Sequence, residues 1–228
     1  HLLGRSQIHE LNKDDILTLG NFRIRFFRIN HNIPDGVGLA VNTPAGLMVY
    51  ATDWKFDHTP VDGRPSEFDK LAKYGGEGVA LLMSDSTNAT KPGYSVSEKT
   101  LGDTIDRIIQ DAKGRVVFAT FSTLISRIQQ VIDAAHKTNR KLVVTGRSMV
   151  NNIEICLATN YLTLPAKGMI IKMEQANKLP DNQVVILTTG SQGEEASALA
   201  RIARGEHKTI QIKKGDTCVV SANPIPGN

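Results

Sequence analysis

From residue 91 onward, the sequence alternates between short apolar runs and longer stretches with apolar residues at helical spacing. The apolar runs predict strands at 115–121, 141–146, 183–190 and 216–222. The stretches between or before them predict helices at 95–112, 124–139, 151–162 and 194–205. Strands that alternate with helices at this spacing form a parallel sheet with helices on its faces. This alternation therefore constrains the fold of the chain more than any other feature.

The residues before 91 follow a different pattern. Residues 22–29, FRIRFFRI, alternate arginine with apolar residues and predict a strand with one wet face. Residues 37–51 predict a hairpin that turns at TPAG, and residues 66–78 predict a short helix capped by Ser66. The apolar run VALLMSD, at 79–85, predicts a buried strand. We therefore expect an α/β chain with two domains, at 1–90 and 91–228.

The composition limits the class of protein and its surroundings. The formal net charge is +4 and the sequence pI is about 9.1, which permits an anionic partner without requiring one. The two cysteines, Cys156 and Cys218, lack a C-x-x-C spacing and are expected in a helix core and a strand core. No apolar run reaches transmembrane length and no signal-peptide pattern is present, so we expect a cytoplasmic protein without a membrane partner. Because the first residue is His1, we expect an excerpt of a longer chain.

Three polar residues follow predicted strands in the first part of the chain. His31 precedes NIPDG and Asp53 ends the run MVYATD. An imidazole and a carboxylate suit Zn²⁺ or Mn²⁺, but two ligands do not fill a coordination shell. The structural alternative is a hydrogen-bonded loop histidine and a turn aspartate. Asp85 lies in LLMSDSTNA. It could cap a helix or form a turn. Alternatively, its carboxylate could accept a hydrogen bond from a metal-binding histidine and orient that ring.

A second group of candidates follows strands of the predicted parallel sheet. The segment TTGSQGEE, at 188–195, joins a strand to a helix and offers backbone N–H groups that attract phosphate. It has neither the lysine of a P-loop nor the G-x-G-x-x-G spacing, so a nucleotide cofactor is not indicated. Arg127 and Arg147 also follow strands of this sheet, and a guanidinium group suits phosphate oxygens. Both arginines could instead form salt bridges to Glu154, Glu194 or Glu195. The candidate phosphate contacts at this edge, which become RNA contacts under the family resemblance described next, are Arg127, Arg147, Ser148, Ser191, Gln192 and Gly193.

Several segments together resemble the ribonuclease J family, in the β-CASP branch of the metallo-β-lactamase superfamily. They occur in the family's order along the chain. They are NHNIPDGVG, TDWKFDHTPV, LLMSDSTNA, FATFSTLISRIQQVI, GRSM, LTTGSQGE, ALARIARGEH and the closing NPIPGN. The resemblance implies part of a metallo-β-lactamase αββα domain followed by a β-CASP domain with a mainly parallel sheet flanked by helices.

The resemblance also assigns roles to individual residues. It implies that His31 is a zinc ligand and that Asp53 is the carboxylate that bridges two zinc ions. Asp85 would match the acidic motif at the start of the β-CASP region, where it hydrogen-bonds a histidine that assists the reaction. The family's main metal motif, H-x-H-x-D-H, is absent from this sequence, so the segment alone is expected to bind zinc weakly and to cleave RNA poorly.

The sequence departs from the family at three positions. Thr52 stands where the family usually has glycine, immediately before the bridging aspartate. Leu124 and Ser126 stand where the family usually shows Asn and His, so the family's RNA contacts are not expected at these two positions.

The function implied by the resemblance is metal-dependent hydrolysis of RNA phosphodiester bonds in RNA processing and decay. Two metal ions would generate a hydroxide and hold the scissile phosphate, single-stranded RNA would be the partner, and the full-length protein would be a homo-oligomer. One alternative is a non-catalytic RNA-binding or scaffold module that works without metal. The other is a metallo-β-lactamase-fold hydrolase of small substrates, which would not need the part of the chain after residue 90.

Overall fold

The computed structural model describes residues 7–222 of the chain. Contacts between Cα atoms divide the chain into two compact units, His1–Ser97 and Glu98–Asn228. We describe each unit by itself and call them unit 1 and unit 2. Within residues 7–222, no helix is both long enough and apolar enough to cross a membrane.

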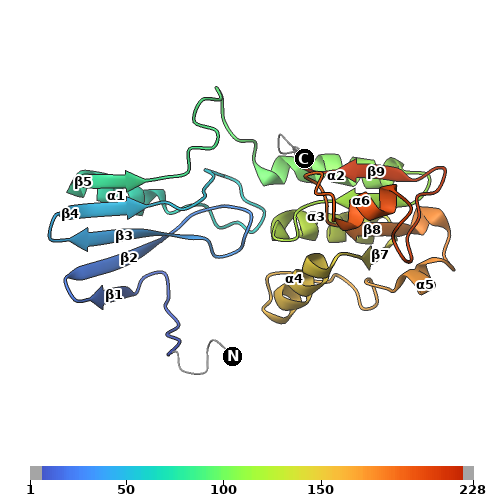
Figure 1. Cartoon of the computed structure of the whole chain (residues 1–228), viewed down its shortest axis with the longest axis horizontal. Helices are drawn as coiled ribbons and strands as arrows, with labels where there is room; N and C mark the ends of the chain where they lie inside the picture. The colour runs from blue at the N-terminus through green and yellow to red at the C-terminus, as the bar shows by residue number, and fades with distance from the viewer. Residues whose placement is uncertain (1–6, 223–228) are drawn as a thin grey trace. The chain divides into compact units, whose positions relative to one another are not determined.

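Unit 1 contains a five-stranded sheet with one helix (Figure 1). The strands lie in the order β1-β2-β3-β4-β5; neighbours up to β4 are antiparallel, whereas β5 is parallel to β4. The elements are β1 (Ile16–Leu19), β2 (Phe22–Arg28), β3 (Val37–Thr43), β4 (Gly46–Tyr50), α1 (Phe68–Glu77) and β5 (Val79–Met83). The strand at 22–29, the hairpin and the helix are confirmed, while β1 was not expected.

Two details of unit 1 differ from the expectations. Ser66 does not cap α1: its hydroxyl donates to Asn30 Oδ1 at 2.9 Å and accepts from the Asn30 N–H at 3.1 Å. The run at 79–85 forms a strand, but the expectation that it is buried is wrong, because all five residues of β5 are exposed. As the last strand of the sheet, β5 has a neighbour on one side only.

Unit 2 contains a four-stranded sheet in the order β7-β8-β6-β9, in which every pairing is parallel (Figure 1). The strands are β6 (Val116–Ala119), β7 (Lys141–Val144), β8 (Val184–Thr188) and β9 (Thr217–Val220). The helices are α2 (Glu98–Asp111), α3 (Ile125–Lys137), α4 (Arg147–Ala158), α5 (Met173–Ala176), α6 (Ala198–Ala203) and the 3₁₀ turn η1 (Asp181–Gln183). The predicted parallel sheet flanked by helices is therefore confirmed, with α5 and η1 as unexpected short additions.

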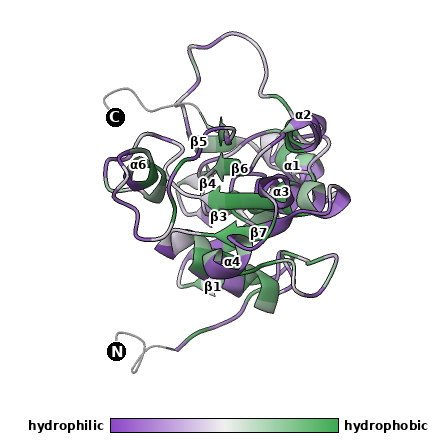
Figure 2. Cartoon of the chain, turned by 90° about the vertical axis from the view of Figure 1, so that its right-hand side faces the viewer, coloured by the Kyte–Doolittle hydropathy of each residue, from purple (hydrophilic) through white to green (hydrophobic). Residues whose placement is uncertain are grey.

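Both faces of this parallel sheet are covered. Val116 and Phe118 of β6 pack into a cluster with α2, α3 and α4, while Val117 packs into a second cluster with residues of α5 and α6. All four residues of β6 are fully buried, and the strands β6 and β7 are coloured as hydrophobic in Figure 2. Burial on both faces explains why these strands are continuous apolar runs in the sequence.

The two cysteines lie in the predicted elements but not in equivalent surroundings. Cys156 is buried in α4, as expected for a helix-core residue. Cys218 lies in β9 and is exposed, so the expectation of a strand-core position is wrong. The strand β9 is at the edge of its sheet, and an edge strand has less cover than a central one.

Candidate functional site

His31 and Asp53 lie close together at one end of the sheet of unit 1. The strand β2 ends at Arg28, and Asn30 then forms an isolated antiparallel bridge with Lys55, whose N–H donates to Asn30 O at 2.8 Å. This bridge brings the loop after β2 next to the loop after β4. His31 Nε2 is 3.8 Å from Asp53 Oδ2, and the two side chains are 35% and 76% exposed. The proximity expected from the sequence is therefore present.

Asp85 lies beside the same loop. Its backbone N–H donates to Thr52 O at 3.3 Å, and its carboxylate accepts from the Thr87 N–H at 2.9 Å and from the Thr87 hydroxyl at 2.5 Å. The hydrogen bonds from Thr87 lower the pKa of Asp85, and a positive charge on His31 would lower it further. The carboxylate of Asp85 therefore has the turn-forming contacts of the structural alternative, with His31 near enough to act on it.

The donor groups in this loop region fall short of a complete zinc site. A structural zinc takes four protein ligands and a catalytic zinc takes three with an open position. Among residues 7–222, no group of three or more His, Cys, Asp or Glu side chains is placed to hold a metal ion. His31 and Asp53 have suitable chemistry and spacing for two of the ligands, but the described residues do not complete the set.

Three loops meet at the carboxyl edge of the parallel sheet in unit 2, as the sequence predicts. The Thr120 N–H, after β6, donates to Thr188 O at 3.1 Å at the end of β8. A Cβ on Gly146, after β7, would lie 2.8 Å from Thr189 Oγ1, so these two loops are in close contact. The Asn152 side chain of α4 donates to Ser122 O at 2.9 Å. The segments FSTLISR, GRSM and TTGSQGE are thus neighbours.

Arg127 does not offer its guanidinium at this edge. The residue is 8% exposed, its Nη2 lies 2.6 Å from Glu98 Oε2, and its Nη1 donates to Ser221 O at 2.8 Å. A guanidinium that is buried and held by a carboxylate and a carbonyl is not available to a phosphate. We therefore correct the assignment of Arg127 from an RNA contact to a structural residue. The salt-bridge alternative describes it better, but the partner is Glu98 and not Glu154, Glu194 or Glu195.

The other candidates at this edge differ in accessibility. Arg147 and Ser148 are exposed at the start of α4, and within the described residues no ion pair joins Arg147 to Glu154, Glu194 or Glu195. Ser191 is 2% exposed, and its Oγ has no hydrogen-bond partner. Thr120 is fully buried, and its Oγ1 also has no hydrogen-bond partner.

The same loop has two further candidates with different surroundings. The N–H of Gln192 donates to Glu194 Oε2 at 3.2 Å, whereas Gly193 is exposed with φ of 87°. This edge therefore combines one exposed cation with buried hydroxyls that retain hydrogen-bonding capacity. The sequence did not single out Thr120, although its place directly after the β6 run marks it as an edge residue.

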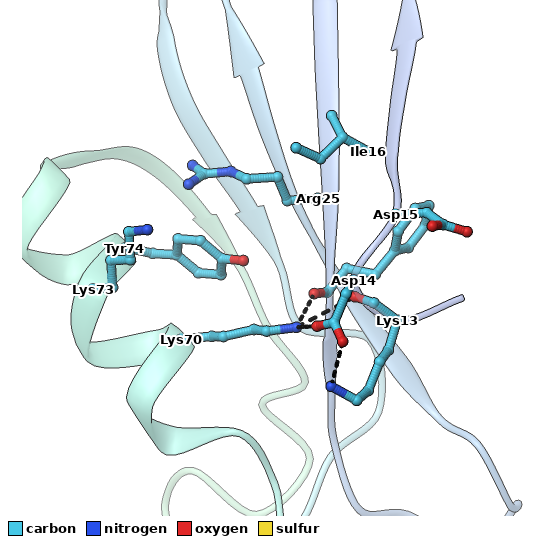
Figure 3. A pocket seen from close by; sticks show the side chains of 9 residues that line it. Lys13, Asp14, Asp15, Ile16, Arg25, Lys70, Lys73 and Tyr74 are labelled. Atoms are coloured by element: carbon cyan, nitrogen blue, oxygen red, sulfur yellow. Dashed lines mark hydrogen bonds and ion pairs between the residues drawn. The ribbon is translucent and has the colours of Figure 1, made fainter. Parts of the chain in front are cut away.

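A pocket of about 160 Å³ lies elsewhere in unit 1, between β1, β2 and α1 (Figure 3). Two of its cationic groups, those of Lys70 and Arg25, already have partners. Lys70 Nζ is 3.0 Å from Asp14 Oδ1 and donates to Phe26 O at 3.2 Å. Arg25 lies over the Tyr74 ring, 4.5 Å from its centroid, and makes two hydrogen bonds to Glu77. These contacts fasten α1 to the sheet, so we interpret the pocket as part of the structure rather than as a binding site.

Comparison with known proteins first defines the class of unit 2. The sequence family described as Ribonuclease J, beta-CASP domain, matches residues 113–228, which include the parallel sheet and its carboxyl edge. A crystal structure of a protein of unknown function from Enterococcus faecalis V583 has a TM-score of 0.59 and covers 93% of this chain and 57% of that one. Its sequence identity is 15%, so the likeness concerns the fold alone.

Curated relatives extend the match over the whole chain. Ribonuclease J of Corynebacterium glutamicum is 45% identical over 224 residues, which are 98% of this chain and 31% of the relative. Ribonuclease J of Thermus thermophilus is 44% identical over 226 residues, which are 99% of this chain and 39% of the relative. The chain belongs to the ribonuclease J family and spans about a third of the length of these relatives.

Proposed function

We propose that this chain is the part of a ribonuclease J that holds RNA at the carboxyl edge of the β-CASP sheet, in a protein that hydrolyses RNA phosphodiester bonds. The observation that carries the proposal is the convergence of three loops at this edge, with the side chains of Arg147 and Ser148 exposed at the start of α4. A single strand would be bound mainly through its phosphates, because those are the groups that an arginine and hydroxyls recognise. The net charge of +4 is compatible with the same partner.

We further propose that unit 1 is one half of a metallo-β-lactamase αββα domain. Residues paired across its sheet share a face, and one of the two faces carries apolar side chains from all five strands. We call this set the open face: Leu17, Leu19, Phe22, Ile24, Phe26, Leu39, Val41, Met48, Tyr50, Leu81 and Met83. None of these residues belongs to the buried cluster of unit 1, which lies on the other face with Tyr74 of α1. A second sheet packed on the open face would complete the fold.

We propose that His31 and Asp53 supply two ligands of a zinc pair whose remaining ligands come from outside this segment. Their separation of 3.8 Å supports a shared metal centre, and Asp85 would orient a histidine beside it. The metal content of a protein of the relatives' length tests this assignment. We place the protein in the cytoplasm and expect the complete protein to form a homo-oligomer, both by analogy with the family.

RNA binding by this chain tests the proposed surface. Replacing Arg147 with alanine should weaken binding of a short single-stranded RNA and reduce the slope of log affinity against log salt by about 0.7, the value for one phosphate contact on a single strand. The matched control is Arg107→Ala, which removes the same charge from an exposed position in α2.

Fluorescence anisotropy across a salt series provides the measurement. If Arg147→Ala binds like Arg107→Ala at every salt concentration, the carboxyl edge is not the RNA surface. If a protein of the relatives' length binds RNA but does not cleave it when loaded with zinc, the non-catalytic alternative replaces hydrolysis.

A further inference from the structure

We propose that His207 is a positioning residue for the RNA surface: as the neutral tautomer with its hydrogen on Nε2, it fixes the turn that presents Arg147. This inference rests on the proposed function, since it concerns the same edge of the sheet. His207 lies between α6 and β9 and ends the segment ALARIARGEH, and the sequence analysis gave this histidine no role.

The hydrogen bonds of the imidazole define its tautomer. Nδ1 accepts from the backbone N–H groups of Thr209, at 3.4 Å, and Ile210, at 3.2 Å. A nitrogen that accepts two N–H groups carries no hydrogen, so in the neutral ring the hydrogen is on Nε2. Nε2 is 3.1 Å from Thr145 Oγ1, and it therefore donates to this hydroxyl. Ile210 is 1% exposed within the core, so the ring is attached to a rigid part of unit 2.

The contact with Thr145 fixes the path of the chain into α4. The Thr145 N–H donates to Leu187 O at 2.9 Å, and Gly146 follows with φ of 97°. Gly146 is packed against Thr189, and Arg147 is the first residue of α4. With both its N–H and its hydroxyl held, Thr145 has little freedom, and the direction in which Arg147 leaves the turn is set by these contacts. Without the imidazole, the Thr145 hydroxyl would lose this partner, and only the Thr145 N–H would still be held.

The surroundings keep the imidazole neutral. Burial lowers the pKa of His207, and the positive charge of Arg201 on α6 lowers it further. The neighbouring Glu206 pairs with Arg204 at 2.9 Å, Lys208 is exposed, and the group that faces the ring from the turn before α4 is the uncharged hydroxyl of Thr145. Protonation would occupy Nδ1 and break its hydrogen bonds to the backbone of residues 209 and 210. Stability from the neutral ring is present above the ordinary pKa of about 6.5 and is lost as the pH falls through the lowered value.

Two substitutions separate this role from a general effect on folding. His207→Asn keeps an acceptor oxygen near the position of Nδ1, removes the contact with Thr145, and cannot titrate. Thr145→Val removes the other partner of the same contact and keeps its shape. The matched control is His136→Asn, at an exposed position near the end of α3.

The affinity for a short single-stranded RNA is measured between pH 5 and pH 8, together with the urea midpoint of each variant. Both test variants should weaken binding at pH 7.5 by about threefold to tenfold, and the double variant should lose no more than either alone, because both remove one contact. The parent and His136→Asn should lose affinity as the pH falls through the pKa of His207, and His207→Asn should not. Parent-like affinity and pH profile in both test variants would overturn the proposal, as would a lowered urea midpoint with unchanged affinity.

Amide resonances separate this proposal from the proposed function. In ¹H–¹⁵N spectra, the amides of Gly146 and Arg147 should shift in both test variants and not in His136→Asn. If the parent binds no RNA at any pH, the proposed function fails, and the positioning of the turn is then decided by these shifts. Their absence would show that His207 does not position Arg147.

Discussion

Thr52 adopts a backbone conformation that its side chain disfavours. Its φ is 55°, in the left-handed region, where a β-branched residue is uncommon. The other non-glycine residues with positive φ within the described chain are Asp35, Asn139 and Asn160, which tolerate this region better. Thr52 precedes Asp53, and its carbonyl accepts from the Asp85 N–H, so the unfavourable conformation occurs where the candidate zinc ligand is placed. The family's usual glycine at this position fits the observed backbone.

Thr52→Gly should therefore stabilise unit 1. Relief of the left-handed conformation is worth about 1–2 kcal/mol, and the greater freedom of glycine in the unfolded chain costs about 0.5–1 kcal/mol. We expect a net gain of about 0.5–1 kcal/mol in the free energy of unfolding, measured by urea denaturation. Thr52→Ala is the control, because it shortens the side chain but keeps the Cβ atom. Equal stability of the glycine and alanine variants would show that the backbone of Thr52 is not strained.

Single residues also show where prediction from the sequence ends. His31 and Asp53 could be expected to meet because each follows a strand, and strand ends are positioned by the sheet. The burial of Arg127 could not be expected, because its partners Glu98 and Ser221 are 29 and 94 residues away in the sequence. The same is true of His207, whose partner Thr145 lies 62 residues earlier. Contacts of this kind depend on the tertiary packing and leave no local pattern.

At the scale of elements, the hydrophobic pattern predicted the parallel sheet of unit 2 and misjudged β5 of unit 1. In unit 2, the apolar runs of β6, β7 and β8 are covered on both faces, so pattern and burial agree there, whereas the edge strand β9 is partly exposed. In β5 a similar run is exposed, and on the open face Leu81 is 52% and Met83 45% accessible. An apolar run indicates burial in the complete protein, and the residues that would cover β5 are not among those described. The wrong expectation for β5 therefore supports a partner for the open face.

Leu81→Lys tests the open face. In this chain the substitution should change the free energy of unfolding by less than about 0.5 kcal/mol, because the side chain is already half exposed. In a protein of the relatives' length, a second sheet would bury the position, and an unpaired charge there should cost about 2–4 kcal/mol. Tyr94→Lys, at a fully exposed loop position, should have little effect in both proteins. A small and equal effect of Leu81→Lys in both proteins would rule out a sheet on the open face.

At the scale of the whole molecule, the two units differ in how much of their sheet is covered and in which candidate site they contain. Unit 2 has a sheet buried on both faces and contains all three loops of the proposed RNA surface. Unit 1 has an apolar open face, and its candidate metal ligands number two among the described residues. We therefore expect RNA binding to depend on unit 2, and hydrolysis to require unit 1 together with further parts of a longer protein. A substitution in unit 1 that removes a metal ligand should separate these two properties.

Asp53→Ala in a protein of the relatives' length makes that separation measurable. The Asp53 side chain is 76% exposed and its contact with His31 is long, at 3.8 Å, so its removal should leave both units folded. Loss of a carboxylate ligand should lower the zinc content and abolish RNA cleavage, while RNA affinity changes by less than about threefold, because the phosphate contacts lie elsewhere. Zinc content by mass spectrometry, RNA affinity by anisotropy and cleavage of a labelled strand are compared with Asp62→Ala, an exposed loop aspartate in the same unit. Cleavage at the parent's rate by Asp53→Ala would remove Asp53 from the proposed metal centre, and an equal loss in Asp62→Ala would mean that folding, not ligation, is affected.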